Sequence, residues 1–275
     1  MEIKLIAFDL DGTLLNDNKE VSEENFRALM EAAAKGIEIV PATGRLPGVM
    51  PEALRGLPIR YAIFVNGAEV VDLQTGEVIS RTLIPWQKAI EVFREGEQYP
   101  IAYDCYMENF GYMSQKFYDR IPEFIISPHF VKMVYETRHA VPELKAFLSQ
   151  EKKDVQKLLF YFREDQQELR EELLLNWKIP GIEVSSSFPG NLELNHAEGI
   201  KGPALKRLAD HLGIPMEQTM AFGDGHNDLS MISMAGFGVA MEECWPGVRE
   251  VADYVTCSCN DSGVAKAIRK FCLDN

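Results

Sequence analysis

The sequence lacks the features that mark membrane-spanning and disulfide-stabilised proteins. No apolar run approaches the roughly 18–20 residues that a membrane-spanning helix requires. The chain opens directly into an apolar strand, without a basic and then apolar leader, so we expect no signal sequence. Its five cysteines are an odd number and are scattered, which is typical of reduced thiols. We therefore expect a cytoplasmic protein that has no membrane partner.

Positive charge is also scarce. The chain has 28 Lys and Arg residues against 42 Asp and Glu residues, a formal net charge of −14. No basic stripe is available to displace counterions, so nucleic acid is excluded as the expected partner. A small phosphorylated molecule is not excluded, because a metal ion and one or two cations can bind a phosphate locally. The sequence does not indicate an oligomeric state.

The stretch that organises the chain is an apolar strand ending in two carboxylates. Residues 5–8 form a continuous apolar run, typical of a strand buried on both faces of a parallel sheet. Asp9 and Asp11 follow it, and Gly12 allows a turn there. Two carboxylates so close together disfavour each other's ionised forms, so a cation is expected to hold both ionised. Mg²⁺ suits such an all-oxygen site. Taken alone, these residues also fit an ordinary turn.

Elements on either side of a central segment predict a doubly wound α/β core. A helix is expected after Ser22, with strands at 37–40 and 61–65 and a hairpin at 69–83. Strands and helices alternate again after residue 191, beginning with a strand at 191–195. We expect a core made of residues 1–83 and 191–275. Residues 84–190, with strands expected to be antiparallel, are interpreted as an inserted α+β domain.

Polar residues follow the strands of this core at one edge. The strand at 219–222 runs into Asp224, and the strand at 37–40 ends near Thr43. Ligands of open α/β sheets bind at the carboxyl ends of the strands, so these turns can converge with Asp9 and Asp11. Asp9, Asp11 and Asp224 would form a hard-oxygen Mg²⁺ site, with Thr43 and Lys201 available to phosphoryl oxygens. One carboxylate can attack phosphorus and another can transfer protons.

Four motifs, in this order, resemble those of the haloacid dehalogenase-like phosphatases. They are Asp9-Leu10-Asp11-Gly12-Thr13, Ala42-Thr43-Gly44-Arg45, Gly199-Ile200-Lys201-Gly202 and Gly223-Asp224-x-x-Asn227-Asp228. The inserted segment is similar in position and size to the α+β cap of the Cof-type branch, and Asn66-Gly67-Ala68 also resembles that branch. The resemblance covers nearly the whole chain. It implies a Rossmann-like core with an inserted cap that sets substrate specificity.

The resemblance also implies roles for the carboxylates. Asp9 would be the nucleophile that becomes phosphorylated, and Asp11 the general acid and base. Asp224 would bind Mg²⁺ together with the Asp9 carboxylate and the Asp11 backbone carbonyl. Asp228 would reach the metal directly or through water, or sit behind the ligands, although it also suits the start of a helix, where the dipole favours a negative charge.

Further roles concern the phosphate. By resemblance, Thr43 and Lys201 would hold the phosphoryl group, with Leu10, Gly44 and Asn227 near it. Lys201 opens a helix, where the dipole disfavours a cation, and this local misfit favours a functional role.

Three neighbouring side chains are harder to assign from the sequence. Arg45 follows the phosphate turn and is either a surface arginine or a group that reaches the substrate or the cap. His226 and His196 are interpreted as structural or peripheral. The residues 195–198 and His226 stand where branch members often have a Pro-containing turn and a Glu or another polar residue.

Together these observations predict a Mg²⁺-dependent phosphatase acting through an aspartyl-phosphate on small phosphorylated metabolites, sugar phosphates foremost. Two alternatives are a phosphotransferase or phosphomutase on the same fold, and a ligand-sensing regulator without catalysis. The complete set of candidate residues argues against the regulator.

Overall fold

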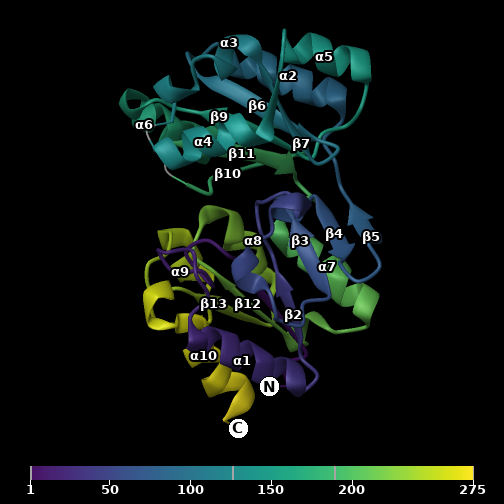
Figure 1. The fold of residues 1–275 in the computed structure, drawn as a ribbon, viewed down its shortest axis with the longest axis vertical. Helices are drawn as coiled ribbons and strands as arrows, with labels where there is room; N and C mark the ends of the chain where they lie inside the picture. Colours follow the sequence, from purple (N-terminus) through teal and green to yellow (C-terminus); the bar gives the residue numbers. More distant parts are fainter. Residues whose placement is uncertain (1, 126, 189, 275) are drawn as a thin grey trace. The chain divides into compact units, whose positions relative to one another are not determined.

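The chain folds into two compact units, which we describe separately from a computed structural model (Figure 1). The structure describes residues 2–125, 127–188 and 190–274. Residues 2–81 and 199–274 form the first unit, called the core here, and residues 82–198 form the second, called the insert. No helix among the described residues is long and apolar enough to cross a membrane.

The core is built on a five-stranded parallel sheet with the strand order β14-β13-β12-β1-β2. The α/β architecture expected from the sequence is therefore confirmed. The bounds of the strands are β1 Leu5–Phe8, β2 Glu38–Pro41, β12 Thr219–Gly223, β13 Phe237–Ala240 and β14 Tyr254–Val255. The helices of the core are α1 Glu23–Ala34, α7 Lys201–Leu212, α8 Leu229–Met234, α9 Pro246–Val251 and α10 Gly263–Ile268.

Both faces of this sheet are buried, which is why β1 reads as a continuous apolar run. Ile6 and Phe8 pack on the side of α1 and α10, whereas Leu5 and Ala7 pack on the side of α7, α8 and α9. Ser22 caps α1, as expected, by accepting a hydrogen bond from the backbone N–H of Asn25. The helices thus enclose the sheet and leave the ends of its strands free to carry a site.

One part of the core differs from the doubly wound pattern expected after β2. No α-helix intervenes there, because two short 3₁₀ helices, Pro47–Val49 and Glu52–Leu54, connect β2 to the next strand. Strand β3 (Tyr61–Phe64) belongs to a separate antiparallel sheet with β4 (Glu69–Asp72) and β5 (Val78–Arg81). A single parallel bridge between Ala42 and Ile63 connects it to the end of β2. An apolar run alone does not distinguish these two kinds of strand.

The insert is an α+β unit with a six-stranded sheet in the order β10-β11-β9-β6-β7-β8. All neighbouring strands are antiparallel except β7 and β8. The strands are β6 Ala102–Met107, β7 Phe110–Ser114, β8 Arg138–Val141, β9 Lys157–Tyr161, β10 Ile182–Ser185 and β11 Asn191–His196. The helices are α2 Trp86–Gly96, α3 Gln115–Tyr118, α4 Pro128–Thr137, α5 Leu144–Glu151 and α6 Gln167–Asn176.

The position of β11 differs from the sequence analysis, which placed the strand at 191–195 in the core. In the structure β11 pairs antiparallel with β10 and β9 inside the insert. Its side chains alternate between apolar residues, such as Leu192 and Leu194, which join the insert's hydrophobic core, and polar ones such as Glu193. Strict alternation is typical of a strand with one apolar face, whereas parallel core strands are apolar throughout.

The polar face of the insert's sheet contains a buried charge network. Arg138 Nε donates a hydrogen bond to Asp104 Oδ2 at 2.8 Å, and Tyr161 OH donates to the same oxygen at 2.8 Å. Lys157 Nζ pairs with Glu193 Oε1 at 2.9 Å. All five side chains are buried. Because each charge has a partner, the network orders this face of the sheet without leaving an isolated ion.

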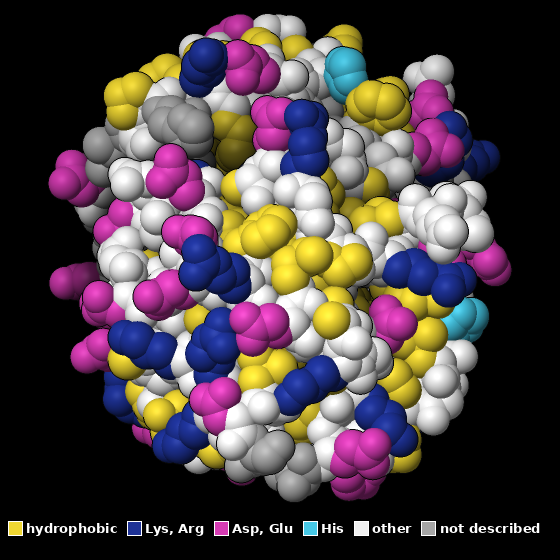
Figure 2. All heavy atoms as spheres, turned by 60° about the horizontal axis from the view of Figure 1, so that its bottom comes forward, with side chains coloured by type: hydrophobic (Ala, Val, Ile, Leu, Met, Phe, Trp, Pro, Cys, Tyr) yellow, Lys and Arg dark blue, Asp and Glu magenta, His cyan; other side chains and the backbone are white. Residues whose placement is uncertain are grey.

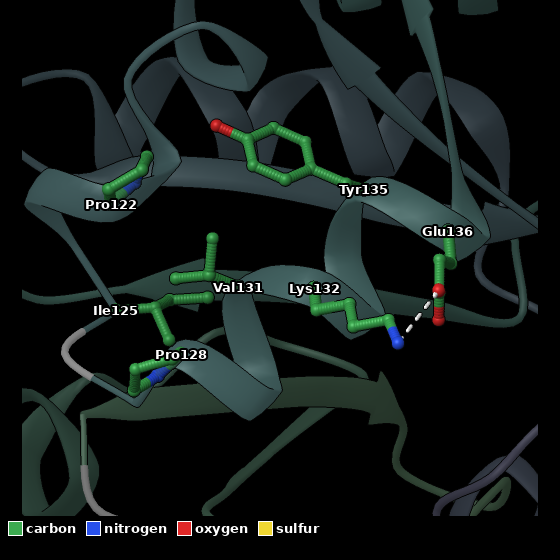
Figure 3. A pocket seen from close by; sticks show the side chains of 7 residues that line it. All are labelled: Pro122, Ile125, Pro128, Val131, Lys132, Tyr135 and Glu136. Atoms are coloured by element: carbon green, nitrogen blue, oxygen red, sulfur yellow. Dashed lines mark ion pairs between the residues drawn. The ribbon is translucent and has the colours of Figure 1, made fainter.

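The insert also has a mainly apolar hollow of 480 Å³ along α4 (Figure 3). One ion pair crosses its edge, between Lys132 and Glu136. No residue singled out as a catalytic or binding candidate lines it. The lining residues are Pro122, Ile125, Pro128, Val131, Lys132, Tyr135 and Glu136.

The acidic excess does not gather in a single area on the face shown in Figure 2. Basic and acidic side chains are interspersed there among apolar and uncharged ones, and neither sign forms a continuous stripe. On that face, the structure therefore offers no extended basic surface of the kind that binds nucleic acid.

Candidate active site

Two neighbouring parallel strands carry the two principal carboxylates at the same edge of the core sheet. Strand β1 pairs with β12, and Phe8 lies opposite Phe222. Asp9 is the first residue after β1, and Asp224 is the first residue after β12. The backbone N–H of Asp9 donates to Phe222 O at 3.0 Å and extends the pairing by one residue. Parallel register therefore brings together two side chains that are 215 residues apart in the sequence.

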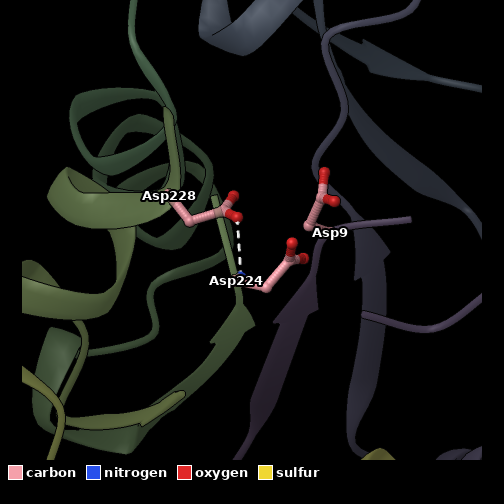
Figure 4. Close-up of side chains that lie close together, drawn as sticks. All are labelled: Asp9, Asp224 and Asp228. Atoms are coloured by element: carbon pink, nitrogen blue, oxygen red, sulfur yellow. Dashed lines mark hydrogen bonds between the residues drawn. The ribbon is translucent and has the colours of Figure 1, made fainter. Parts of the chain in front are cut away.

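Asp228 completes an acidic cluster with them (Figure 4). One carboxylate oxygen from each of Asp9, Asp224 and Asp228 lies within 4.8 Å of those of the other two. Asp9 and Asp228 are buried, and Asp224 is half-buried. Three carboxylates this close disfavour one another's ionised forms unless cations compensate them.

Lys201 is the cation that the fold supplies to this cluster. It is the first residue of α7, and its side chain is fully buried. Its Nζ lies 2.6 Å from Asp9 Oδ1 and 2.6 Å from Asp228 Oδ1. Burial alone would lower the pKa of Lys201, but the two carboxylates outweigh burial and raise it, so the lysine is charged. The helix dipole disfavours a cation at the start of α7, and the two carboxylates compensate for this.

One lysine does not offset the negative charge of the cluster. Burial, together with the charges of Asp228 and Asp224, raises the pKa of Asp9 well above its ordinary value, despite Lys201. Burial and the charge of Asp228 raise the pKa of Asp224 to about 7. Thr13 Oγ1 donates to Asp224 Oδ1 at 2.6 Å and partly opposes this rise. The site favours a further positive charge.

Asp228 has its own hydrogen-bonding partners. While Oδ1 accepts from Lys201, Oδ2 accepts from the backbone N–H groups of Asp224, at 3.0 Å, and Gly225, at 2.9 Å. Asp228 therefore holds the turn that carries Asp224, in addition to contributing charge. Both carboxylate oxygens of Asp228 are thus engaged by protein groups, which is typical of a residue that supports a ligand side chain.

The carboxylate of Asp11 pairs with two other cations. Arg45 donates from Nε to Oδ2 at 3.0 Å, and from Nη2 to both oxygens at 2.9 and 2.8 Å. Lys19 Nζ donates to Oδ1 at 2.9 Å. Burial alone would raise the pKa of Asp11, but Arg45 and Lys19 outweigh it and hold the pKa below its ordinary value. Arg45, ambiguous in the sequence, is thus a neighbour of the site.

The turn at residues 43–45 is fixed to the turn after β3. Thr43 N–H donates to Ile63 O, and Thr43 O accepts from Asn66 N–H, both at 2.9 Å. Arg45 O accepts from Val65 N–H at 3.0 Å. Val65 and Asn66 have positive φ values of 52° and 61°, which are costly for a β-branched residue such as valine. The strained turn therefore places the backbone of Thr43 and Arg45, with Gly44 between them.

The remaining predicted residues border the same edge. Leu10 is buried between the two aspartates, and its carbonyl accepts from Leu15 N–H at 2.8 Å. Asn227 lies in the 3₁₀ helix His226–Asp228 and donates from Nδ2 to Asn66 Oδ1 at 3.1 Å. His226 packs its ring edge-on against Trp245, with centroids 4.6 Å apart, in line with a peripheral role.

Three residues with clear contacts at the site were missed in the sequence. Thr13 was quoted within its motif, but its hydroxyl contact to Asp224 spans 211 residues and has no local signal. Lys19 looks like one of many surface lysines. Asn66 was noted only for its resemblance to a family pattern, although an asparagine before a glycine does signal a left-handed turn.

The acidic cluster has the donor set that a divalent cation prefers. Its side-chain donors are carboxylate oxygens, and hard cations such as Mg²⁺ and Ca²⁺ bind oxygen. The raised pKa values of Asp9 and Asp224 are the signature of negative charge that a bound cation would compensate. The backbone at Gly12 lies so close to the Asp224 carboxylate that no side chain fits there, because a Cβ at Gly12 would lie 2.5 Å from Asp224 Oδ2. The residues present therefore fit a divalent metal.

Comparison with known proteins agrees with this combination of fold and site. A model of the haloacid dehalogenase-like hydrolase family matches residues 6–268. The chain is 32% identical over 274 residues to the 5-amino-6-(5-phospho-D-ribitylamino)uracil phosphatase YcsE of Bacillus subtilis, covering 99% of this chain and 97% of that protein. It is 32% identical over 291 residues to the phosphatase YwpJ of the same organism, covering 97% and 99%. The solved structure of the subclass IIB sugar phosphatase BT4131 matches with a TM-score of 0.79 at 28% identity, over 98% of this chain and 99% of that one.

An α/β core with an acidic strand edge and a buried lysine, matched along its length by phosphatases, defines the class of this protein as a phosphatase. The chain belongs to the haloacid dehalogenase-like hydrolase family. The resemblance noted in the four sequence motifs is thereby confirmed.

Proposed function

We propose that the protein is a Mg²⁺-dependent phosphomonoester hydrolase that acts on small phosphorylated metabolites through a phosphorylated Asp9. The observation that carries this proposal is the convergence of Asp9, Asp224 and Asp228 around one buried lysine. An acidic cluster with a single fixed cation suits a substrate that is itself an anion and arrives beside a metal ion.

In the proposed first half-reaction, Asp9 is the nucleophile. A carboxylate oxygen of Asp9 attacks phosphorus, and the bond between phosphorus and the leaving oxygen breaks. Asp11 must carry a proton for this step, although Arg45 and Lys19 favour its ionised form, and it gives that proton to the leaving oxygen, which departs as an alcohol. Lys201 and Thr43 hold the phosphoryl oxygens during this transfer, and Lys201 also keeps Asp9 oriented through their shared hydrogen bond.

The second half-reaction returns the enzyme to its starting state. A water molecule attacks the phosphorus of phospho-Asp9, Asp11 accepts the proton of that water, and the bond to the Asp9 oxygen breaks to release phosphate. Backbone N–H groups around Leu10 and Gly44, and the side-chain amide of Asn227, provide further hydrogen bonds to the phosphoryl group.

A metal ion held by Asp9 and Asp224, with the Asp11 carbonyl as a further oxygen ligand, would neutralise charge that develops on the phosphoryl oxygens. Mg²⁺ is the proposed ion because it prefers oxygen ligands and accepts one or two carboxylates together with a substrate phosphate. Asp228 supports the turn that carries Asp224 through its hydrogen bonds, and it reaches the ion through water.

Sugar phosphates and related phosphorylated polyols are the proposed substrate class. Two relatives carry substrate names, a sugar phosphatase and a phosphatase of a phosphoribitylamino compound, and both names describe a phosphorylated polyhydroxylated chain. We assign selectivity for the rest of the substrate to the insert.

The proposal is tested by phosphate release from a panel of sugar phosphates, nucleotides and cofactor phosphates, with Mg²⁺ and with EDTA. Turnover is expected only with the metal, and Asp9→Asn should abolish it. Asp210→Asn is a matched control, because Asp210 lies on the surface of α7 and pairs with Lys206. Absence of phosphate release across the panel, or full activity of Asp9→Asn, would overturn the proposal.

A further inference from the structure

The Asp11 carboxylate is held by two cations that come from different parts of the core. Arg45 lies on the turn after β2, whereas Lys19 lies only eight residues beyond Asp11. Lys19 and Arg45 both donate to Oδ1, and Arg45 also donates to Oδ2. Both oxygens of Asp11 are thus engaged as acceptors, and these hydrogen bonds restrain the orientation of the carboxylate.

Lys19 occupies a tight loop whose backbone is fixed. Asn16 N–H donates to Glu20 O at 3.0 Å, and Lys19 N–H donates to Asn16 O at 2.9 Å. The side chain of Asn16 accepts from the N–H groups of Asn18 and Glu20, both at 3.0 Å. Lys19 itself has a φ of 62°, in the left-handed region that a lysine rarely adopts. The loop therefore holds Lys19 in a conformation that it would not favour by itself.

A second contact ties this loop to the C-terminal part of the core. Asp17 N–H donates to Asn260 Oδ1 at 3.2 Å, and Asn260 Nδ2 donates back to Asp17 Oδ2 at 3.0 Å. Asn260 lies in the 3₁₀ helix Cys259–Asp261. The paired hydrogen bonds restrain the loop from outside, so Lys19 reaches Asp11 from a fixed base although its own side chain is exposed.

The two cations differ in where they lie relative to the proposed phosphate turn. Arg45 follows the turn that we assign to the phosphate and is a candidate for contact with the substrate, a contact that would compete with its hydrogen bonds to Asp11. Lys19 sits on the same segment as Asp11 and has no such second task. A base that activates water must stay ionised and oriented after the leaving group has gone.

We propose that Lys19 is a positioning residue for the second half-reaction: it keeps the Asp11 carboxylate oriented as the base that takes a proton from the attacking water. This inference rests on the proposed function. Water loses a proton to Asp11 as its oxygen bonds to phosphorus and the bond to Asp9 breaks, and Lys19 itself exchanges no proton. Lys19 does not act on the substrate, so its loss leaves the first half-reaction intact for a substrate whose leaving group needs no proton from Asp11.

The test is rapid-mixing kinetics of Lys19→Met with p-nitrophenyl phosphate and Mg²⁺. This aryl phosphate needs little help from an acid, because p-nitrophenolate leaves readily without a proton. We expect kcat to fall by about fivefold, the effect of one exposed ion pair, with kcat/KM unchanged. A burst of p-nitrophenolate approaching one equivalent per active site should appear, together with phosphorylated protein after an acid quench. Lys19→Arg should restore most of kcat.

The matched control is Lys206→Met. Lys206 also pairs with a carboxylate, Asp210, and the exposures of the two pairs are similar, with side chains 52% and 60% exposed against 55% and 40% for Lys19 and Asp11. Lys206→Met should change neither kcat nor kcat/KM. Asn260→Ala removes the hydrogen bonds that restrain the loop but keeps the Lys19 side chain, so it should also lower kcat, by less than Lys19→Met does.

Two results would overturn the inference. An equal fall of kcat and kcat/KM in Lys19→Met would place Lys19 in the first half-reaction, and unchanged constants would reduce the pair to a surface contact. The proposed function fails separately, when the unmodified protein releases no phosphate or when Asp9→Asn still gives a burst.

Discussion

Lys201 Nζ lies 2.6 Å from Asp9 Oδ1, and the lysine is fully buried. The two residues are 192 positions apart in the sequence, and the lysine side chain is shielded from bulk water. A buried ion pair of this kind contributes little net stability while intact, but it is costly to break on one side.

Replacing Lys201 with methionine should therefore destabilise the metal-free protein by about 3–5 kcal/mol, because two buried carboxylates lose their cation. Urea unfolding measures this, and Mg²⁺ should recover part of the loss. Lys206→Met, at an exposed position of the same helix, is the control and should unfold close to the unmodified protein. Equal stability of the two variants would mean that Lys201 does not compensate the cluster.

Gly12→Ala should damage metal binding beyond its effect on the backbone. A Cβ at Gly12 would lie 2.5 Å from Asp224 Oδ2, and the φ of Gly12 is 88°. Gly76→Ala is a matched control, because Gly76 has a φ of 75° and its Cβ would meet nothing within 4 Å. Both variants should lose about 1–2 kcal/mol of stability from the backbone conformation alone, and Gly12→Ala should lose more because of the contact with Asp224. Only Gly12→Ala should weaken Mg²⁺ binding, by about tenfold or more, in isothermal titration calorimetry.

The metal-free protein should become less stable as the pH rises toward neutrality. The folded-state pKa of Asp224 is about 7, above its ordinary value of 3.8, so folding favours the protonated form. This contribution to stability is complete below the ordinary value and is lost as the pH rises through about 7. Urea unfolding between pH 5 and 8 measures it. Asp224→Asn should reduce the dependence, whereas a slope unchanged in that variant would contradict the assignment.

The charge network of the insert should also depend on both partners. Arg138→Met leaves Asp104 buried without its cation, which should cost about 3–5 kcal/mol in the free energy of unfolding. Adding Asp104→Asn removes that charge and should recover most of the loss, since Tyr161 can still donate to the amide oxygen. Chemical unfolding of the two variants decides this. A double variant as unstable as the single one would show that packing, and not charge, sets the cost.

The principal carboxylates of the candidate site could be predicted because their signals are local. The apolar run before Asp9 and the one before Asp224 each end in an acidic turn, and parallel strands place such turns at one edge. The contact between Thr13 and Asp224 could not be predicted, since nothing near either residue indicates its distant partner. The orientation of Asp11 toward Arg45 and Lys19 depends on two loop conformations, including the left-handed Lys19, which residue patterns do not specify.

The same limit applies to the fold. The order of strands and helices predicts a parallel arrangement for strand β3, and only its pairing partner shows that it belongs to an antiparallel sheet. The misplacement of β11 was avoidable, because its alternating polar and apolar residues are typical of a strand with one apolar face and not of a parallel core strand. Helix α2 could also have been predicted from the sequence, because the apolar residues Ala89, Ile90 and Phe93 recur at helical spacing after Pro85.

The split of the core in sequence has a consequence for its synthesis. Strand β1 leaves the ribosome long before its neighbour β12, which ends at Gly223. Until then one edge of β1 lacks its partner, and the insert, which is complete at residue 198, is available to fold first. An unpaired apolar strand edge is a site for misassociation during that interval. We therefore expect nascent chains stalled before residue 223 to bind chaperones more strongly than chains released after it.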